Sequence, residues 1–246
     1  MIGFDKIDIN EDLLIGLPFE EGTDLFAYDR AKPHHILTQN VPGGGSFSWG
    51  NEATGVPYIE FVTLGAGVTD GVYFDCPAVN TVDLDFTNDD YSIGGWINWE
   101  WNGTSSLIIG RYGVDLDGWE IYLDISGGLN TVSQRHHHSS LAPNNNSNCY
   151  STGWTPSNWW LLGISRSGAS LYPQHYRNAE PLDMSYEDTG MLDPDTCNRD
   201  LVIGCRYTKN ANWYKSKMWN LRVWGRCLTQ EDWSFILHRE GNWFGL

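Results

Sequence analysis

The stretch DGWEIYLDIS, residues 117 to 126, alternates apolar and polar side chains with a period of two. Side chains of an extended chain point to opposite sides in turn, so its apolar members share one face. These are Trp119, Ile121, Leu123 and Ile125. The members of the opposite face are Glu120, Tyr122 and Asp124. The pattern predicts a β-strand with one buried face.

The same alternation recurs on both sides of this stretch. In YSIGGWINWEW, residues 91 to 101, Trp96 lies opposite a face that is mostly large and apolar. That face carries Tyr91, Ile93, Ile97, Trp99 and Trp101. Further strand-like runs occupy residues 58–64, 106–113, 158–168, 169–178, 201–207 and 214–225. Short turns rich in Gly, Asn, Asp and Ser separate them, which predicts an all-β fold, a two-sheet antiparallel jelly-roll sandwich.

One segment near the end has a helical pattern instead. In LTQEDWSFILHRE, residues 228–240, Thr229 and Asp232 fit the capped start of a helix, with Trp233, Ile236 and Leu237 on its packing face. We therefore expect a short C-terminal helix. The 246 residues fit one domain, 1–246, because β-sandwiches of this size commonly remain undivided.

The charge and composition exclude several classes of partner. The chain has 31 acidic and 15 basic residues, a net charge of -16, which would repel a nucleic-acid backbone. No apolar run approaches the ~20 residues of a membrane span, so we expect no membrane insertion, and the first residues do not resemble a signal peptide. Five cysteines cannot all pair within the chain, and free thiols are expected, with Cys149 and Cys197 at the surface.

Four longer segments resemble the laminin-G-like or concanavalin A-like jelly-roll family. They are LPFEEGTD, DFTNDDYSIGGW, GWTPSNWWLLGISRSG, and the ending DLVIGCR followed by MWNLRVWGRCLTQEDW. The resemblance covers about residues 12–240. It departs from the family where the usual Y-x-N-G hairpin reads YRNA at residues 176–179. The resemblance implies a sandwich in which the last strand continues into a short helix.

The subgroup most similar to this sequence is found among virion structural proteins of tailed phages. The residues that carry this similarity are DRAKPHHILT, RHHH and RDLVIGCR. It implies a protein made in the host cytoplasm without a signal peptide and displayed on the virion surface. Its partners would be phage capsid or tail proteins and further copies of itself. A fold shared by lectins, enzymes and shell proteins does not decide among these functions.

The histidine run in QRHHHSS, residues 134–140, is the most conspicuous candidate metal site. If the preceding strand continues through it, His136 and His138 share one face, and Arg135 and His137 share the other. Such a pair can ligate zinc or copper but needs a third and usually a fourth donor, which the sequence does not place nearby. A polar strand face is the simpler interpretation, so we predict no metal and no required cofactor.

Catalytic patterns are weak. A glycoside hydrolase needs two carboxyl groups, and the E-x-D-x-x-E strand of the glucanase branch is missing, which leaves Glu100 and Glu120 as isolated strand residues. No G-x-S-x-G elbow is present. The stretch VPGGGSFSWGN, residues 41–51, lacks the G-K-[ST] of a phosphate loop and is interpreted as a turn. We predict that the protein is not an enzyme.

Glycan binding is more plausible, because aromatic faces stack on sugars and amide side chains bind hydroxyl groups. The longest polar loop, residues 139–156, holds the candidate glycan- or partner-binding residues. These are Asn144, Asn145, Asn146, Tyr150 and Trp154. The alternative is that the tryptophan fills the core and the asparagines only form turns.

Calcium is a further possibility from the family resemblance, since laminin-G-like domains often bind it at one rim. The acidic stretches are Asp115–Asp117, Asn88–Asp90 and Asp193–Asp195, none with a diagnostic spacing. Taken together, the sequence predicts a non-enzymatic structural protein of a phage particle, on the capsid or tail, that forms homo-oligomers, with a trimer expected. The alternative is a lectin or adhesin that binds cell-surface glycans, and the third choice is a glycoside hydrolase.

Overall fold

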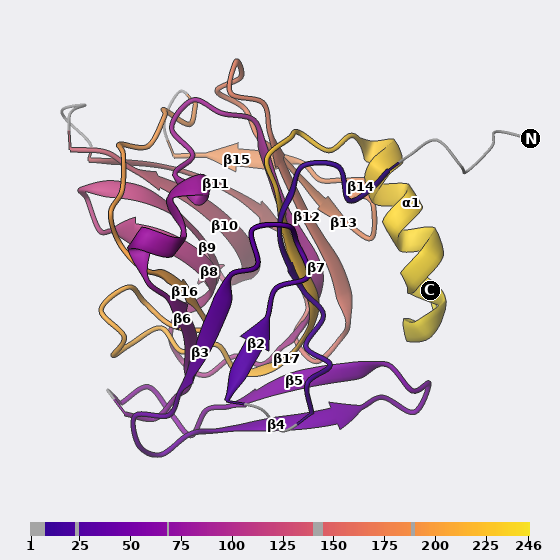
Figure 1. Cartoon of the computed structure of the whole chain (residues 1–246). Coiled ribbons are helices and arrows are strands. Elements are labelled where there is room, and N and C mark those ends of the chain that lie inside the picture. The colour runs from indigo at the N-terminus through magenta and orange to yellow at the C-terminus, as the bar shows by residue number, and fades with distance from the viewer. Residues whose placement is uncertain (1–7, 23–24, 68, 140–144, 188–189) are drawn as a thin grey trace, which may run out of the picture.

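The structure is a computed structural model that describes residues 8–22, 25–67, 69–139, 145–187 and 190–246. Within these ranges it is a sandwich of two antiparallel sheets, of eight and nine strands, with α1 (Gln230–Glu240) lying beside it (Figure 1). The predicted all-β jelly-roll sandwich with a short C-terminal helix is confirmed.

The eight-stranded sheet carries the helix on its outer face. Its strands, in spatial order, are β14 (Glu180–Pro181), β13 (Gln174–Arg177), β12 (Trp160–Arg166), β7 (Tyr91–Trp99), β17 (Ser216–Trp224), β5 (Pro57–Val62) and β4 (Ser46–Asn51). The remaining strand, β1 (Leu13–Leu17), pairs with the second half of β17. Both β7 and β17 are nine residues long, and they form the centre of this sheet.

The nine-stranded sheet forms the other layer. Its order is β15 (Met184–Tyr186), β11 (Asn146–Thr152), β10 (Leu129–His137), β9 (Asp117–Ser126), β8 (Ser106–Gly113), β16 (Leu201–Ile203), β6 (Tyr73–Cys76), β3 (Ile36–Asn40) and β2 (Phe26–Tyr28). Short 3-10 turns occupy Ala78–Asn80, Val82–Leu84 and Gly241–Phe244.

The alternation in residues 117–126 produces the core as predicted, with one difference. Trp119, Ile121 and Leu123 are buried between the sheets, each with an exposed fraction of 1% or less. On the other face Glu120 and Tyr122 are also buried, because a second aromatic cluster covers this side of the sheet. The centre of β9 is therefore buried on both faces. Burying each large apolar side chain stabilises the fold by about 1.5–3 kcal/mol.

Several predicted boundaries differ from the observed strands. The runs 106–113 and 117–126 match β8 and β9 residue for residue. The run 169–178 contributes only β13, because residues 167–173 form turns. Residues 41–51 are not a single turn, since their second half is β4. Likewise, the predicted loop 139–156 contains β11, in which small polar side chains extend the nine-stranded sheet.

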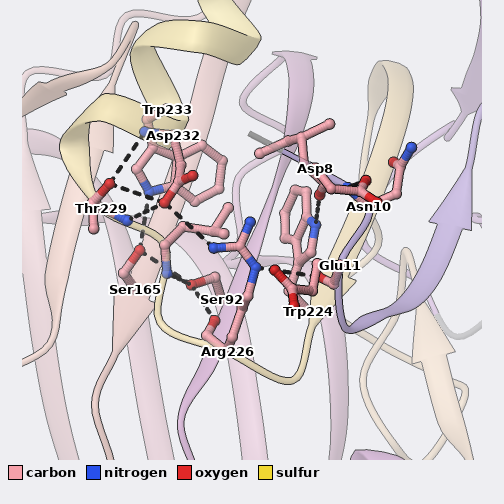
Figure 2. Close-up of polar contacts among 12 residues, drawn as sticks. Asp8, Asn10, Glu11, Ser92, Ser165, Trp224, Arg226, Thr229, Asp232 and Trp233 are labelled. Carbon is pink, nitrogen blue, oxygen red and sulfur yellow. Dashed lines mark hydrogen bonds and ion pairs between the residues drawn. The ribbon is translucent and has the colours of Figure 1, made fainter. Parts of the chain in front are cut away.

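Helix α1 begins as predicted. Thr229 accepts a hydrogen bond from the Asp232 backbone N–H and Asp232 accepts one from the Thr229 backbone, which together form a capping box (Figure 2). Trp233 is fully buried and donates its ring N–H to Ser165 Oγ at 3.0 Å. Trp233 lies on Gly94 and Gly163, which are register partners on β7 and β12, and a Cβ atom at either glycine would come within 3 Å of the indole. The two glycines therefore form the surface on which the helix packs through Trp233.

The segment before β1 is held next to the start of α1. Arg226 donates from Nε to the Glu11 carbonyl at 3.1 Å and from Nη1 to the Asp232 carboxylate at 3.4 Å (Figure 2). Trp224 donates its ring N–H to the Ile9 carbonyl at 2.7 Å. These contacts fix the N-terminal segment and the helix on neighbouring positions over the outer face of the eight-stranded sheet.

Candidate functional site

The first of the three consecutive histidines points into the core. His136 on β10 is fully buried, its Nε2 lies 2.6 Å from the Tyr91 hydroxyl, and its Nδ1 lies 2.8 Å from the Leu192 carbonyl. The carbonyl can only accept, so Nδ1 carries the proton and Nε2 accepts from Tyr91. The hydroxyl oxygen of Tyr91 in turn accepts from the Gln134 amide. Both ring nitrogens of His136 are thus used within the core, and it cannot be the metal ligand considered above.

The second histidine lies on the outer face of the nine-stranded sheet. His137 Nδ1 accepts from the Asp115 backbone N–H at 3.1 Å, so its Nε2 carries the proton and donates to Glu120 Oε1, also at 3.1 Å. The third, His138, is 1% exposed. Among the residues described, no group of three or more His, Cys, Asp or Glu is arranged to hold a metal ion.

Trp154 does not belong to an exposed sugar-binding loop, contrary to the expectation from the sequence. It is fully buried, packs in the main core and donates its ring N–H to Ser151 Oγ at 3.0 Å. Ser151 contacts His175 Nδ1 at 2.9 Å, and His175 Nε2 lies 3.9 Å from the thiol of Cys149. Burial lowers the pKa of His175 to about 3 and raises the pKa of Cys149. These side chains therefore form an uncharged hydrogen-bonded chain in the core.

The other members of the predicted glycan site are spread over different environments. Asn144 lies outside the described residues. Asn145 is exposed, whereas Asn146 is half-buried and donates to Asp115 Oδ1 at 2.6 Å. Tyr150 is half-buried on β11 opposite Ser133, on the sheet face away from Trp154. The structure does not bring these side chains together with Trp154 around one sugar-sized space.

The two candidate catalytic carboxylates also lie apart. Glu120 is 5% exposed and accepts from Arg135 at 3.3 Å as well as from His137. Glu100 follows β7 in the other sheet and pairs with Lys215 at 2.8 Å. The surface thiols are also different from those expected, since Cys149 and Cys197 are both buried and only Cys227 is partly exposed.

Two of the acidic stretches considered for calcium, Asp115–Asp117 and Asp193–Asp195, come close together, but hydrogen-bond donors occupy their carboxylates. Asp115 accepts from Asn146, Asp117 accepts from the Cys197 thiol at 3.2 Å, and Asp195 accepts from Ser139. Calcium requires six to eight converging oxygen atoms. Because donors point at these oxygens, the carboxylates of these two loops do not fit a calcium site.

A cleft of about 1220 Å³ opens on the outer side of the eight-stranded sheet. Four segments form it: residues 8–20, the turn at residues 30–33, β17 at residues 219–222, and the second half of α1. Trp219 and Phe235 contribute an apolar surface, and most other lining side chains are polar or charged. We refer to it as the α1–β17 cleft.

A β-bulge determines which side chains face the α1–β17 cleft. The pairing of β17 with β7 shifts between Trp219 and Arg222, and Asn220 has a left-handed backbone with φ of 52°. Asparagine tolerates this conformation better than most residues. Bulges redirect side chains and occur frequently beside binding sites. Here the bulge places Trp219, Asn220 and Arg222 together on the lining of the cleft.

The Glu240 carboxylate fixes the polar groups around this bulge. It accepts from Asn220 Nδ2 at 3.0 Å, from Trp96 Nε1 at 2.7 Å, and from Arg222 Nη2 at 2.9 and 2.8 Å. Hydrogen bonds to a charged group are stronger than those between neutral groups. The amide and guanidinium are therefore held in one orientation before any ligand arrives, which reduces the entropy cost of binding.

The cleft carries both signs of charge. Its basic residues are Arg30, Lys32, Arg222 and Arg239, and its acidic residues are Asp8, Glu11, Asp12, Glu20 and Glu240. Arg30 pairs with Glu20, and Arg222 with Glu240, so much of this charge is neutralised internally. The cleft therefore offers hydrogen-bond donors and acceptors side by side, and its electrostatic potential is not dominated by charge of one sign.

Sequence reasoning missed the α1–β17 cleft because its parts are far apart in the chain. One local signal was present: Asn220 interrupts a strand-like run, and asparagine is depleted from strands but accepts positive φ.

No described helix is long and apolar enough to cross a membrane.

The fold is similar to those of clostridial toxin binding domains. The binding domain of botulinum neurotoxin serotype G matches with a TM-score of 0.63 and 13% identity, over 93% of this chain and 51% of that one. The binding domain of Paraclostridial mosquitocidal protein 1 matches with a TM-score of 0.65 and 14% identity, over 96% and 56%. The ligand-binding domain of botulinum neurotoxin serotype D, in complex with N-acetylneuraminic acid, matches with a TM-score of 0.60 and 12% identity, over 94% and 52%.

These similar structures are binding domains rather than catalytic ones. This chain spans about half of the length of each, and at this level of identity the likeness shows the fold alone. No protein-family model and no curated protein sequence matches the chain. The comparisons and the geometry together describe a β-sandwich of the jelly-roll type whose structural neighbours bind ligands.

Proposed function

We propose that this protein is a non-catalytic module that binds a glycan in the α1–β17 cleft. The observation that carries the proposal is the bulge at Asn220, which presents an amide and a guanidinium, both held by Glu240, at the base of a concave site. Binding sites are usually concave, partly apolar and lined by a few oriented polar groups. The similar toxin domains, one of them with a bound sialic acid, support a binding role.

The chemistry of the lining favours a hydroxyl-rich ligand over a strongly charged one. A sugar hydroxyl both donates and accepts, so it needs donors such as Arg222 beside acceptors such as the Asn220 carbonyl oxygen. Trp219 and Phe235, each 8% exposed, add a small apolar surface that the C–H groups of a sugar ring can contact. A polyanion would meet the carboxylates of Asp8 and Glu11 in the same cleft. Neutral or singly charged glycans are therefore the expected ligands.

The experiment is a glycan-array screen with the fluorescently labelled chain, followed by calorimetric titration of any hit. Asn220→Gly removes the amide while keeping a residue that accepts a φ of 52°, and Arg222 and Trp96 still hold Glu240. Loss of a hydrogen bond should weaken binding about tenfold. Tyr150→Ala is the matched control, because it alters the binding loop that the sequence predicted.

Two results would contradict the proposal. The first is an array on which the protein binds no glycan above background. The second is a glycan whose affinity falls in Tyr150→Ala and is unchanged in Asn220→Gly, which would transfer the site to β11.

A structural role on a phage particle remains a proposal that rests on the sequence resemblance, and the toxin domains have no bearing on it. The same holds for the homotrimer and for the virion surface. Cryo-electron microscopy of the native particle would test all three, since ordered copies on a symmetric shell are expected if the proposal is correct.

A further inference from the structure

Most edges of the two sheets are protected against pairing with another chain. Exposed edge strands have unpaired backbone groups, and natural proteins shorten, bend, charge or cover them. Three outer strands are very short: β2 and β15 have three residues each, and β14 has two, one of them Pro181. The outer side of β1 is covered, because Gly16 donates to Asp29 Oδ1 and accepts from the Arg30 backbone N–H.

The remaining edge strand, β4, has none of these protections among the residues that the structure describes. Its sequence SFSWGN, residues 46–51, contains neither proline nor a charged residue. It pairs with β5 at six consecutive positions without a bulge. It is the outermost strand at the lower edge of the molecule in Figure 1. In a chain with 31 acidic and 15 basic residues, an uncharged edge of this length is unexpected.

The ladder with β5 shows which backbone groups of β4 point outward. Glu52 donates its backbone N–H to the Val56 carbonyl in the same register as β4 and β5. Hydrogen-bonded pairs alternate along an antiparallel ladder, so Ser48 and every second residue from it bond to β5. The N–H and C=O groups of Phe47 and Trp49 therefore point away from the sheet.

We propose that two copies of this chain pair through β4, antiparallel, about a two-fold axis at Ser48. In this register Phe47 of each copy lies opposite Trp49 of the other, and their outward N–H and C=O groups form two hydrogen-bonded pairs. Directly opposite residues point to the same face, so both aromatic side chains remain on the core side. Phe47 and Trp49 are only partly buried in the single chain and pack against its core, which the second copy would extend.

The pattern of β4 favours a second copy over another extended partner. An aromatic residue stands on each side of Ser48 in the sequence F-S-W. When two copies pair antiparallel about Ser48, each aromatic residue therefore lies opposite an aromatic residue of the other copy. At the axis two exposed serines meet, which brings neither charge nor bulk. Next to the start of β4, Leu64 is 69% exposed and lies near Gly44, which adds apolar surface beside the same edge. This inference is independent of glycan binding.

Cysteine cross-linking tests the register directly. Residues opposite each other at a position without hydrogen bonds have Cα atoms about 4.5 Å apart, within the range for a disulfide. Ser48→Cys should therefore give a covalent dimer on a non-reducing gel after mild oxidation. Ser46→Cys is the matched control, because Ser46 would lie opposite Gly50 and the two introduced cysteines would be about 13 Å apart. Wild type, with four of its five thiols buried, controls for the native cysteines.

Light scattering of the intact chain supplies the second test. Wild type should have twice the mass of one 27.8 kDa chain, and Ser48→Glu should return it to one, because two like charges would face each other at the axis, each beside Glu60 of its own β5. Ser48→Thr should remain dimeric, and near-ultraviolet circular dichroism should show that both variants are folded. A wild type with the mass of one chain, or of the three chains expected from the phage resemblance, would overturn the proposal, and so would a dimer that persists in Ser48→Glu.

Discussion

Tyr91 donates its hydroxyl proton to His136 Nε2 across 2.6 Å in the middle of the core, and this hydrogen bond joins the two sheets. Tyr91 belongs to β7 of the eight-stranded sheet and His136 to β10 of the nine-stranded sheet. Burial raises the pKa of Tyr91, and burial together with Arg166 lowers the pKa of His136 to about 3. The proton therefore stays on the tyrosine, and both groups remain neutral at neutral pH.

The first prediction is a loss of stability in mild acid. His136 and His175 both have a folded-state pKa of about 3, below the ordinary value of 6.5. The unfolded chain binds these protons first, so the stability that the neutral forms provide is complete above pH 6.5 and falls as pH decreases toward 3. Each histidine should contribute a slope of about 1.4 kcal/mol per pH unit. Urea unfolding at a series of pH values measures it.

A control separates the histidines from the many carboxylates. Between pH 6.5 and 5 most carboxylates remain ionised in both states, so the slope in this window reports mainly histidine. In His175→Gln the slope of the unfolding free energy against pH should be smaller by the amount that one histidine contributes, even if the variant is less stable overall. An unchanged slope would show that His175 is not buried in its neutral form.

The second prediction concerns the alkaline side. Burial disfavours the charged form of His35, but hydrogen bonds to Asp29 at 2.8 Å and Asp83 at 3.1 Å outweigh it and raise the pKa of His35 to about 9. A raised pKa gives stability that is complete below pH 6.5 and is lost as pH rises from 6.5 through 9. The urea midpoint should decrease over this window in wild type. In His35→Gln the midpoint should be lower and should decrease less than in wild type between pH 7 and 8, below the range in which the buried thiols, whose pKa values burial raises, begin to contribute.

The sequence predicted the sandwich because its strands are encoded locally. The alternation around Ile121 identifies β9 residue for residue, and the pair Thr229 and Asp232 identifies the start of α1. The run of polar residues that becomes β11 was predicted as a loop, since nothing local shows that β10 and β15 pair with it on both sides. Local composition cannot report pairing with a distant strand.

The candidate site was less predictable for the same reason. The three histidines are adjacent in the sequence, which suggests a common site. In the structure, however, His136 and His137 point to opposite faces of the sheet and have separate hydrogen-bond partners. The α1–β17 cleft joins Asn220 to Glu240 and to the segment near Asn10, which only the packing of α1 brings together. A site formed by tertiary contacts leaves little periodic signal in the sequence.

The third prediction follows from the position of Trp154. Because Trp154 is fully buried and packs in the main core, Trp154→Ala should destabilise the fold by about 3–5 kcal/mol. Trp154→Phe keeps most of the volume but loses the hydrogen bond to Ser151, and it should cost less. Neither change should alter the affinity for a glycan when measured well below the unfolding temperature. A selective loss of affinity in a fully folded Trp154→Phe would restore the original assignment of this residue to the binding site.

The fourth prediction tests the packing of α1, through Trp233, on the glycine pair of β7 and β12. A Cβ atom at Gly163 would lie 2.7–3.0 Å from three atoms of the Trp233 ring, and the ring is rigid and held by Ser165. Gly163→Ala should therefore destabilise the fold by about 1–3 kcal/mol, the usual cost of overpacking. Gly225→Ala is the matched control, because the nearest atom to its Cβ would be the flexible end of Leu14, at 3.3 Å, and the nearest backbone atom, the Asp12 carbonyl oxygen, would be at 3.8 Å.

A double-mutant cycle identifies the cause of that loss. Trp233→Leu removes the ring and is itself destabilising, but it gives the methyl group of Gly163→Ala room. The double variant should therefore be more stable than the sum of the two single effects predicts, by an amount measurable in urea unfolding. If the two effects simply add, Gly163 is required for a reason other than the approach of Trp233, and the packing of α1 on this pair of glycines would need another explanation.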